Sequence, residues 1–103
     1  MGDHKLVEVS VLLDRVSKAT GEVKEEIMAK GVVEYLKSKL REVNAEIIEV
    51  CNKYNVASAK AIEAKYSSGE LEEEGSWRDF FRLSHLEERK VILERLLEEA
   101  SVE

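Results

Sequence analysis

The chain lacks several residue types, and each absence excludes a class of protein. It has no proline, and a single cysteine in 103 residues leaves no intramolecular disulfide or multi-cysteine metal site. No apolar run approaches the roughly 20 residues that a membrane span needs. The N-terminal residues include an early acidic side chain and no long apolar core, unlike a signal peptide. We therefore expect a cytoplasmic protein without a membrane segment.

The composition is that of a folded and unusually charged domain. Hydrophobic residues make up 44% of the chain and charged residues 37%, while aromatic residues make up only 6%. This balance is too apolar for a disordered chain, and the length suits one helical domain over 1–103. Abundant Glu and Lys together with the absence of Gln are typical of thermophilic proteins, which use ion-pair networks.

The net charge of −6 weighs against non-specific nucleic-acid binding, which needs clustered Lys and Arg. The charge is also uneven along the chain. Residues 1–43 carry eight basic and eight acidic side chains, whereas residues 44–103 carry eight basic and fourteen acidic ones. The second part therefore suits a basic partner.

The clearest pattern is a heptad stripe that predicts one long amphipathic helix over about 22–54. Apolar or small residues alternate at spacings of four and three. They are Ala29, Val33, Leu36, Leu40, Val43, Ile47, Val50 and Tyr54. A stripe of this length predicts a helical partner, either within the chain or outside it.

The segment before this helix is ambiguous. As a helix, residues 5–19 place Leu6, Val9, Leu12 and Val16 on one face, whereas as a strand Val7, Val9 and Val11 would alternate with polar residues. The helical pattern accounts for more residues, and we favour it.

The second half predicts a short bridging helix, an acidic loop and a C-terminal helix. Ser58 is a suitable N-cap and Gly69 a suitable stop for the short helix, and an acidic loop over 67–76 follows. The spacing of Ser76 and Asp79 then predicts a capping box. The final helix, over about 84–101, either kinks from an aromatic helix at Ser84 or continues it with two apolar faces. The fold class is all-α, with the C-terminal helix paired antiparallel to the long one.

The only Trp and both Phe, namely Trp77, Phe80 and Phe81, lie within five positions directly behind the acidic loop. An exposed Trp often dominates the energy of a protein interface, and a packed corner of the fold would produce the same cluster. Sequence leaves the choice open.

Residues suited to catalysis are few. Cys51 lies beside the apolar stripe, where a cysteine acts as a small hydrophobe, and His85 has no third group to complete a catalytic arrangement. The pairs Glu22/Glu25 and Glu46/Glu49 have the spacing of magnesium ligands in helical nucleotide pyrophosphohydrolases, which makes such an enzyme a remote alternative. We expect a non-enzymatic protein with no catalytic residue, cofactor or metal.

Short motifs in the second half resemble a pattern found in small prokaryotic helical proteins. The motifs are Tyr54-Asn55-Val56, Ser58, Ser68-Gly69-Glu70-Leu71, Trp77-Arg78-Asp79 and Leu86-Glu87. Several similar proteins are antitoxin-like halves of toxin–antitoxin pairs. The resemblance covers about half of the chain, and it implies a protein partner for the Trp-led segment.

Residues 1–43 also resemble a ribbon-helix-helix DNA-binding domain. The ribbon would be 5–11, with helices over 12–20 and 22–40 around a turn at Gly21. The exposed ribbon positions would carry Leu6, Glu8 and Ser10, where readers of base edges are basic or amide side chains. A DNA-binding regulator is thus the alternative function, and it requires an N-terminal strand.

The function that the sequence favours is a helical protein-interaction module with an antitoxin-like role, which forms a homodimer or binds another small protein. The residues predicted to form its interface are Val33, Leu36, Leu40, Val43, Ile47, Trp77, Phe80 and Phe81.

Overall fold

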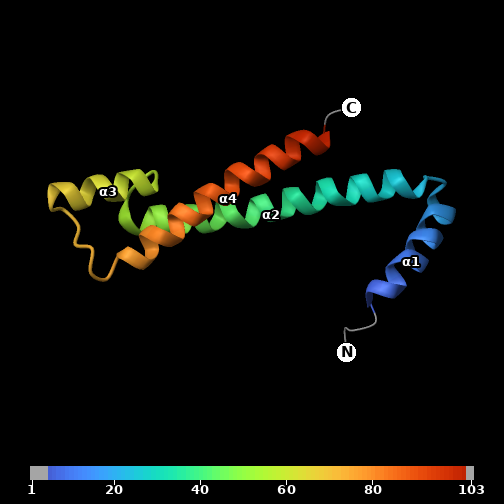
Figure 1. Cartoon of the computed structure of the whole chain (residues 1–103), viewed down its shortest axis with the longest axis horizontal. Helices are drawn as coiled ribbons and strands as arrows, with labels where there is room; N and C mark the ends of the chain where they lie inside the picture. The colour runs from blue at the N-terminus through green and yellow to red at the C-terminus, as the bar shows by residue number, and fades with distance from the viewer. Residues whose placement is uncertain (1–4, 102–103) are drawn as a thin grey trace. The chain divides into compact units, whose positions relative to one another are not determined.

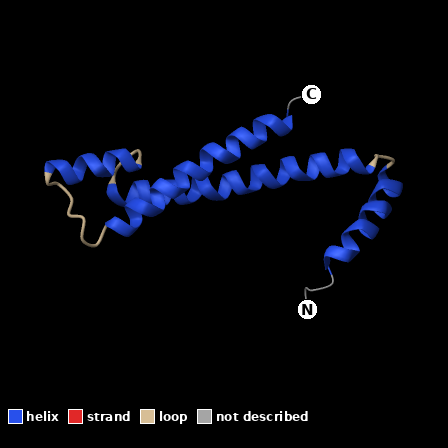
Figure 2. Cartoon of the chain, viewed as in Figure 1, coloured by secondary structure: helices blue, strands red, loops and turns tan. Residues whose placement is uncertain are grey.

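A computed structural model describes residues 5–101, and these form four α-helices joined by short turns and one loop (Figures 1 and 2). The helices are α1 (Lys5–Thr20), α2 (Lys24–Tyr54), α3 (Ala59–Ser68) and α4 (Trp77–Ser101). The predicted all-α class is therefore confirmed, and the long central helix begins two residues later than its predicted start.

The chain divides into two compact units, Met1–Tyr35 and Leu36–Glu103. The helix α2 contributes its first part to one unit and its second part to the other. The two units differ in packing: every buried side chain among residues 8–100 lies in the second unit.

In the first unit, the N-terminal segment is helical, so the predicted alternative of an N-terminal strand is wrong for residues 5–11. The turn after α1 is closed by Gly21 at φ 80° and by the Ser17 hydroxyl, which donates to the carbonyl of Glu22 at 2.6 Å. Asp14 and Lys24 form an ion pair of 2.6 Å across this turn. The ribbon-helix-helix alternative fails because it needs an extended ribbon where α1 lies.

The second unit holds the hydrophobic core. Its central cluster of buried side chains comes from α2, α3 and α4 and consists of Val50, Cys51, Ala59, Ile62 and Leu83. Two contacts show that α4 runs antiparallel to this part of α2: Arg82 pairs with Glu46, and Asp79 pairs with Lys53 further along α2 (Figure 1). The predicted antiparallel pairing of the two helices is confirmed.

Local capping sets the ends of α3 as the sequence predicts. The Ser58 side chain accepts a hydrogen bond from the Ala61 amide, and Gly69 ends the helix in the left-handed conformation at φ 81°. The carboxylate of Glu87 on α4 accepts a further hydrogen bond from the Ala59 amide at 2.9 Å. This bond satisfies one of the free amides at the start of α3 and fixes α3 against α4.

The C-terminal helix is longer than predicted, because α4 starts at Trp77 and continues through Ser84 without a break. One helix with two apolar faces is therefore correct, and the kinked alternative is wrong. The extra two turns matter for packing, because they carry Phe80 and Leu83 to the core between α2 and α3.

Candidate protein-interaction surfaces

The predicted interface stripe on α2 is largely used within the chain. Leu36 and Val43 are buried, and Val33, Leu40 and Ile47 are partly buried. On α4, buried or partly buried residues follow the same spacing of three and four. They are Leu83, Leu86, Lys90, Leu93 and Leu97. The match of the two patterns explains the antiparallel pairing, and a contact of the α2 stripe with a separate partner stays a prediction.

The first unit exposes apolar side chains that are not among the interface residues predicted from the sequence. Eight large apolar residues there are between 41% and 61% exposed. They are Val9, Val11, Leu12, Val16, Val23, Met28, Val32 and Tyr35. Val9, Leu12 and Val16 share one face of α1, which we call the α1 stripe. The helical spacing of this stripe is visible in the sequence, but its exposure is not.

A second exposed set lies on the first part of α2. Met28, Val32 and Tyr35 are spaced by four and three, and all three are exposed. At 100° of rotation per residue, this set lies about a quarter-turn from the heptad stripe. In the sequence this set is hard to separate from the heptad stripe, because Val32 lies next to Val33 and widens that stripe on one side.

The aromatic cluster divides between core and surface. Phe80 packs against the core, whereas Trp77 is 46% exposed and Phe81 55% exposed. Edge-on ring contacts join Trp77 to Phe81 and Tyr66 to Phe80, both with centroids 5.9 Å apart, and Phe80 lies 5.3 Å from Phe81. The cluster is therefore a packed corner that also presents two aromatic rings to solvent.

An open groove of about 610 Å³ runs along this corner, between α3 and the start of α4. Its lining combines four aromatic rings with charged side chains from α3 and from the acidic loop. These residues include Tyr66, Trp77, Phe80, Phe81, Lys60, Glu63 and Glu73. We call it the aromatic groove.

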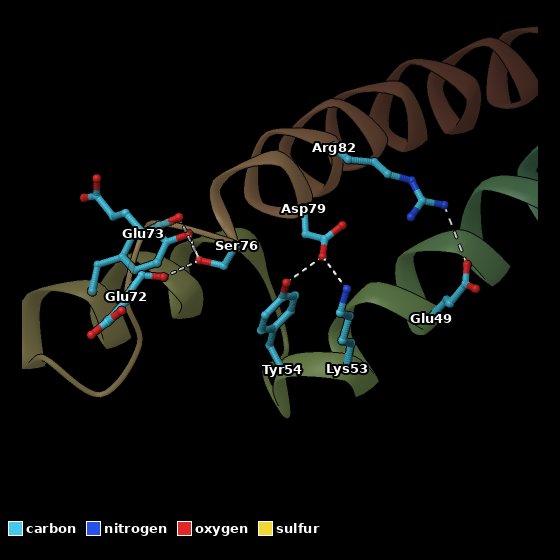
Figure 3. Close-up of polar contacts among 9 residues, drawn as sticks. Glu49, Lys53, Tyr54, Glu72, Glu73, Ser76, Asp79 and Arg82 are labelled. Carbon is cyan, nitrogen blue, oxygen red and sulfur yellow. Dashed lines mark hydrogen bonds and ion pairs between the residues drawn. The ribbon is translucent and has the colours of Figure 1, made fainter.

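Ser76 holds the loop that borders the groove, and it does so differently from the predicted capping box. Its buried hydroxyl lies 2.6 Å from the Glu72 carbonyl (Figure 3). It also lies 2.8 Å from the Tyr66 hydroxyl. A serine hydroxyl has one hydrogen, so it donates to the carbonyl and accepts from Tyr66. The Ser76 amide donates a hydrogen bond to the Glu73 carbonyl. The capping-box prediction is wrong, because Asp79 turns to α2 instead.

Asp79 joins the start of α4 to the end of α2. Its Oδ2 accepts hydrogen bonds from the Tyr54 hydroxyl at 2.5 Å and from the Lys53 ammonium at 2.8 Å (Figure 3). The hydrogen bond from Lys53, followed by that from Tyr54, holds the pKa of the Asp79 carboxyl below its ordinary value of 3.8. Nearby, Arg82 lies between Glu46 at 2.9 Å and Glu49 at 3.6 Å.

We expect Asp79→Asn to lower the free energy of unfolding by about 1–2 kcal/mol at pH 7, because it weakens a charge-assisted pair of bonds. The pKa is lower in the folded state, so the contribution is complete above the unfolded value of 3.8 and is lost as the pH falls through the folded-state pKa. The difference between the variant and the wild type should therefore shrink below about pH 4. Urea unfolding at pH 7 and pH 3 measures both values.

Asp14→Asn is the matched control for this experiment. Asp14 also has a lowered pKa, chiefly because of its hydrogen bond with Lys24, but its side chain is exposed to solvent. Solvent screens such a pair, so we expect a smaller loss than for Asp79→Asn. Equal losses in the two variants would contradict the role given to Asp79.

The residues considered for chemistry lie apart from the groove lining. Cys51 is in the core, where burial, followed by the charge of Glu87, raises the pKa of its thiol. His85 is exposed on α4. In the part of the chain that the structure describes, no three or more His, Cys, Asp or Glu side chains form a group that could hold a metal ion. In each of the two glutamate pairs considered as a remote alternative for magnesium, one member forms an ion pair within the chain: Glu22 contacts Lys30, and Glu46 contacts Arg82.

The fold and these surfaces define an all-α protein built on an antiparallel helical pair. A family model described as "Uncharacterized protein MJ0235 family" matches residues 7–103, and the chain belongs to that family. Neither the search of curated proteins nor the search of solved structures found a match. None of the helices formed by residues 5–101 has both the length and the apolar character needed to cross a membrane.

Proposed function

We propose that the protein is a non-enzymatic helical interaction module that first assembles with a second copy of itself. One observation carries this proposal: residues 8–35 contain no buried side chain, yet they expose eight large apolar ones. Most helical stability in proteins comes from burying an amphipathic face rather than from helix propensity. The first unit therefore needs a partner that covers the α1 stripe.

The charge and size of the first unit are compatible with self-association. Residues 5–35 carry five basic and six acidic side chains, so two copies of this unit repel each other little. Residues 36–103 carry eleven basic and fifteen acidic side chains and concentrate the negative charge. A standard interface buries about 800 Å² per partner, and eight half-exposed apolar side chains supply much of that area.

The non-enzymatic part of the proposal is supported by the positions of the reactive side chains. The only cysteine is buried with a raised pKa, which disfavours the nucleophilic thiolate. Our more specific proposal is an antitoxin-like role, in which the second unit binds and neutralises another protein. The exposed Trp77 in the segment that resembles such proteins supports it.

Light scattering tests the homodimer. We expect the wild-type protein to have about twice the chain mass of 11.7 kDa. The double substitution Leu12→Glu and Val16→Glu places two charges on the α1 stripe and should give a monomer, because each buried unpaired charge costs several kcal/mol. Circular dichroism should still show a folded second unit.

The matched control is Val91→Glu with Ile92→Glu, two similarly exposed apolar positions on α4. This variant should keep the dimer mass. A monomeric wild-type protein would exclude the homodimer, and a dimer that survives the α1 substitutions would exclude the α1 stripe as its interface.

A further inference from the structure

The aromatic groove has the geometry of a docking site between two helices. On α3, Lys60, Glu63 and Ser67 face the groove at spacings of three and four, and on α4 Trp77 and Phe81 face it four residues apart. Residues at these spacings lie on one face of a helix. The groove is thus bordered by one row of side chains from each helix, and a third helix packs against such a pair in helix bundles.

The groove is held open by contacts within the chain. The hydroxyls of Ser76 and Tyr66 bond to each other, and Ser76 also bonds to the loop backbone. The ring contact between Trp77 and Phe81 orients both exposed side chains. A partner therefore meets a largely formed site, which reduces the entropy cost of binding.

The charge around the groove favours a basic occupant. Residues 59–76 carry five acidic side chains and two basic ones. Of the two basic ones, Lys60 lines the groove, whereas Lys65 donates a hydrogen bond to the Tyr54 carbonyl and thus serves the core. Glu63 and Glu73 line the groove itself, and the remaining acidic residues lie in the loop beside it.

The same charges argue against a second copy in the groove. The whole chain has a net charge of −6, and its excess of acidic side chains is concentrated in residues 36–103. Like charges placed together at an interface cost free energy and suppress wrong partners.

We propose that the aromatic groove binds a basic amphipathic helix from another protein. Apolar side chains of that helix contact Trp77 and Phe81, and its Lys or Arg side chains pair with Glu63 and Glu73. This is the helix-in-groove mode of peptide recognition. The inference extends the proposed interaction role to a second surface and does not require the homodimer.

Trp77 is the only tryptophan, so its fluorescence reports directly on the groove. The probe is a synthetic amphipathic helix of about 18 residues made of Lys and Leu, a length at which a helix is stable enough to form on binding. The comparison peptide has Glu in place of every Lys. We expect the Lys peptide to shift the Trp77 emission to shorter wavelength with saturation, and the Glu peptide to leave it unchanged.

Three variants of the full chain locate the binding. Phe81→Ala removes an exposed apolar contact, and Glu63→Lys with Glu73→Lys reverses the charge of the lining; each should weaken binding at least about tenfold. Glu94→Lys with Glu98→Lys makes the same charge change at exposed positions on α4 and should alter the affinity less than about twofold.

Absence of a shift with the Lys peptide, binding of the Glu peptide, or an equal effect of the two charge reversals would each overturn the proposal. Light scattering on the same samples separates this result from the homodimer. A monomeric protein that binds the Lys peptide would support the groove proposal and contradict the homodimer. A dimeric protein that does not bind the peptide would support the homodimer and contradict the groove proposal.

Discussion

Replacement of Leu83 by Ala is expected to lower the free energy of unfolding by about 3 kcal/mol. Leu83 has no exposed surface and lies in the core cluster with Val50, Cys51 and Ile62. Truncation removes three buried carbon atoms and leaves a cavity among helices that the Asp79 and Glu87 contacts hold in place. Domains of this size have a total stability of only about 5–15 kcal/mol, so the loss is a large fraction of it.

Leu96→Ala is the matched control, because it makes the same chemical change on the same helix at a side chain that is 43% exposed. Both substitutions alter helix propensity equally, so the difference between them reports burial alone. Urea unfolding followed by circular dichroism gives both values. Comparable losses in the two variants would mean that α4 does not pack through Leu83.

The second large effect concerns the reactivity of Cys51. We expect the native protein to react with a thiol reagent at least about 100-fold more slowly than the urea-unfolded protein. The side chain is only 8% exposed, and burial raises the pKa of the thiol, so both access and the thiolate fraction are reduced. Absorbance of the released thiolate from a disulfide reagent measures the rate.

An exposed thiol at the next position provides the control. In a Cys51→Ala background, Asn52→Cys places the sulfur at an exposed site on the same turn of α2, where it should react nearly as fast as in the unfolded chain. Adding Leu83→Ala to the wild-type chain should accelerate the reaction of Cys51, because the core around it opens more often. A native Cys51 that reacts as fast as Asn52→Cys would contradict its place in the core.

The parts of the fold that sequence predicted are those set by local rules. The heptad spacing specified α2, and the cap at Ser58 together with the left-handed Gly69 specified both ends of α3. Such features depend on residues within a few positions of one another, so a single chain is enough to read them. The antiparallel pairing of α2 and α4 followed from two matching apolar stripes.

The predictions that failed depended on distant residues. Ser76 and Asp79 are spaced as a capping box, but Tyr66 and Tyr54 offer them stronger partners from α3 and α2. For the C-terminal helix, the sequence left open a kink at Ser84 or one continuous helix with two apolar faces. The helix stays continuous because Phe80 enters the core through one face while Phe81 borders the groove on the other.

In the aromatic groove, too, some features follow from the local sequence and others from contacts between distant residues. Sequence identified Trp77, Phe80 and Phe81 as a cluster and the residues near them as acidic, because composition and spacing are properties of the chain alone. Which rings are exposed depends on how α3 packs against α4, a contact made by residues more than ten positions apart. The α1 stripe was equally visible as a pattern, but its exposure depends on what covers it. Burial depends on packing between segments that are far apart in the sequence. A local sequence pattern does not show which of these segments come into contact.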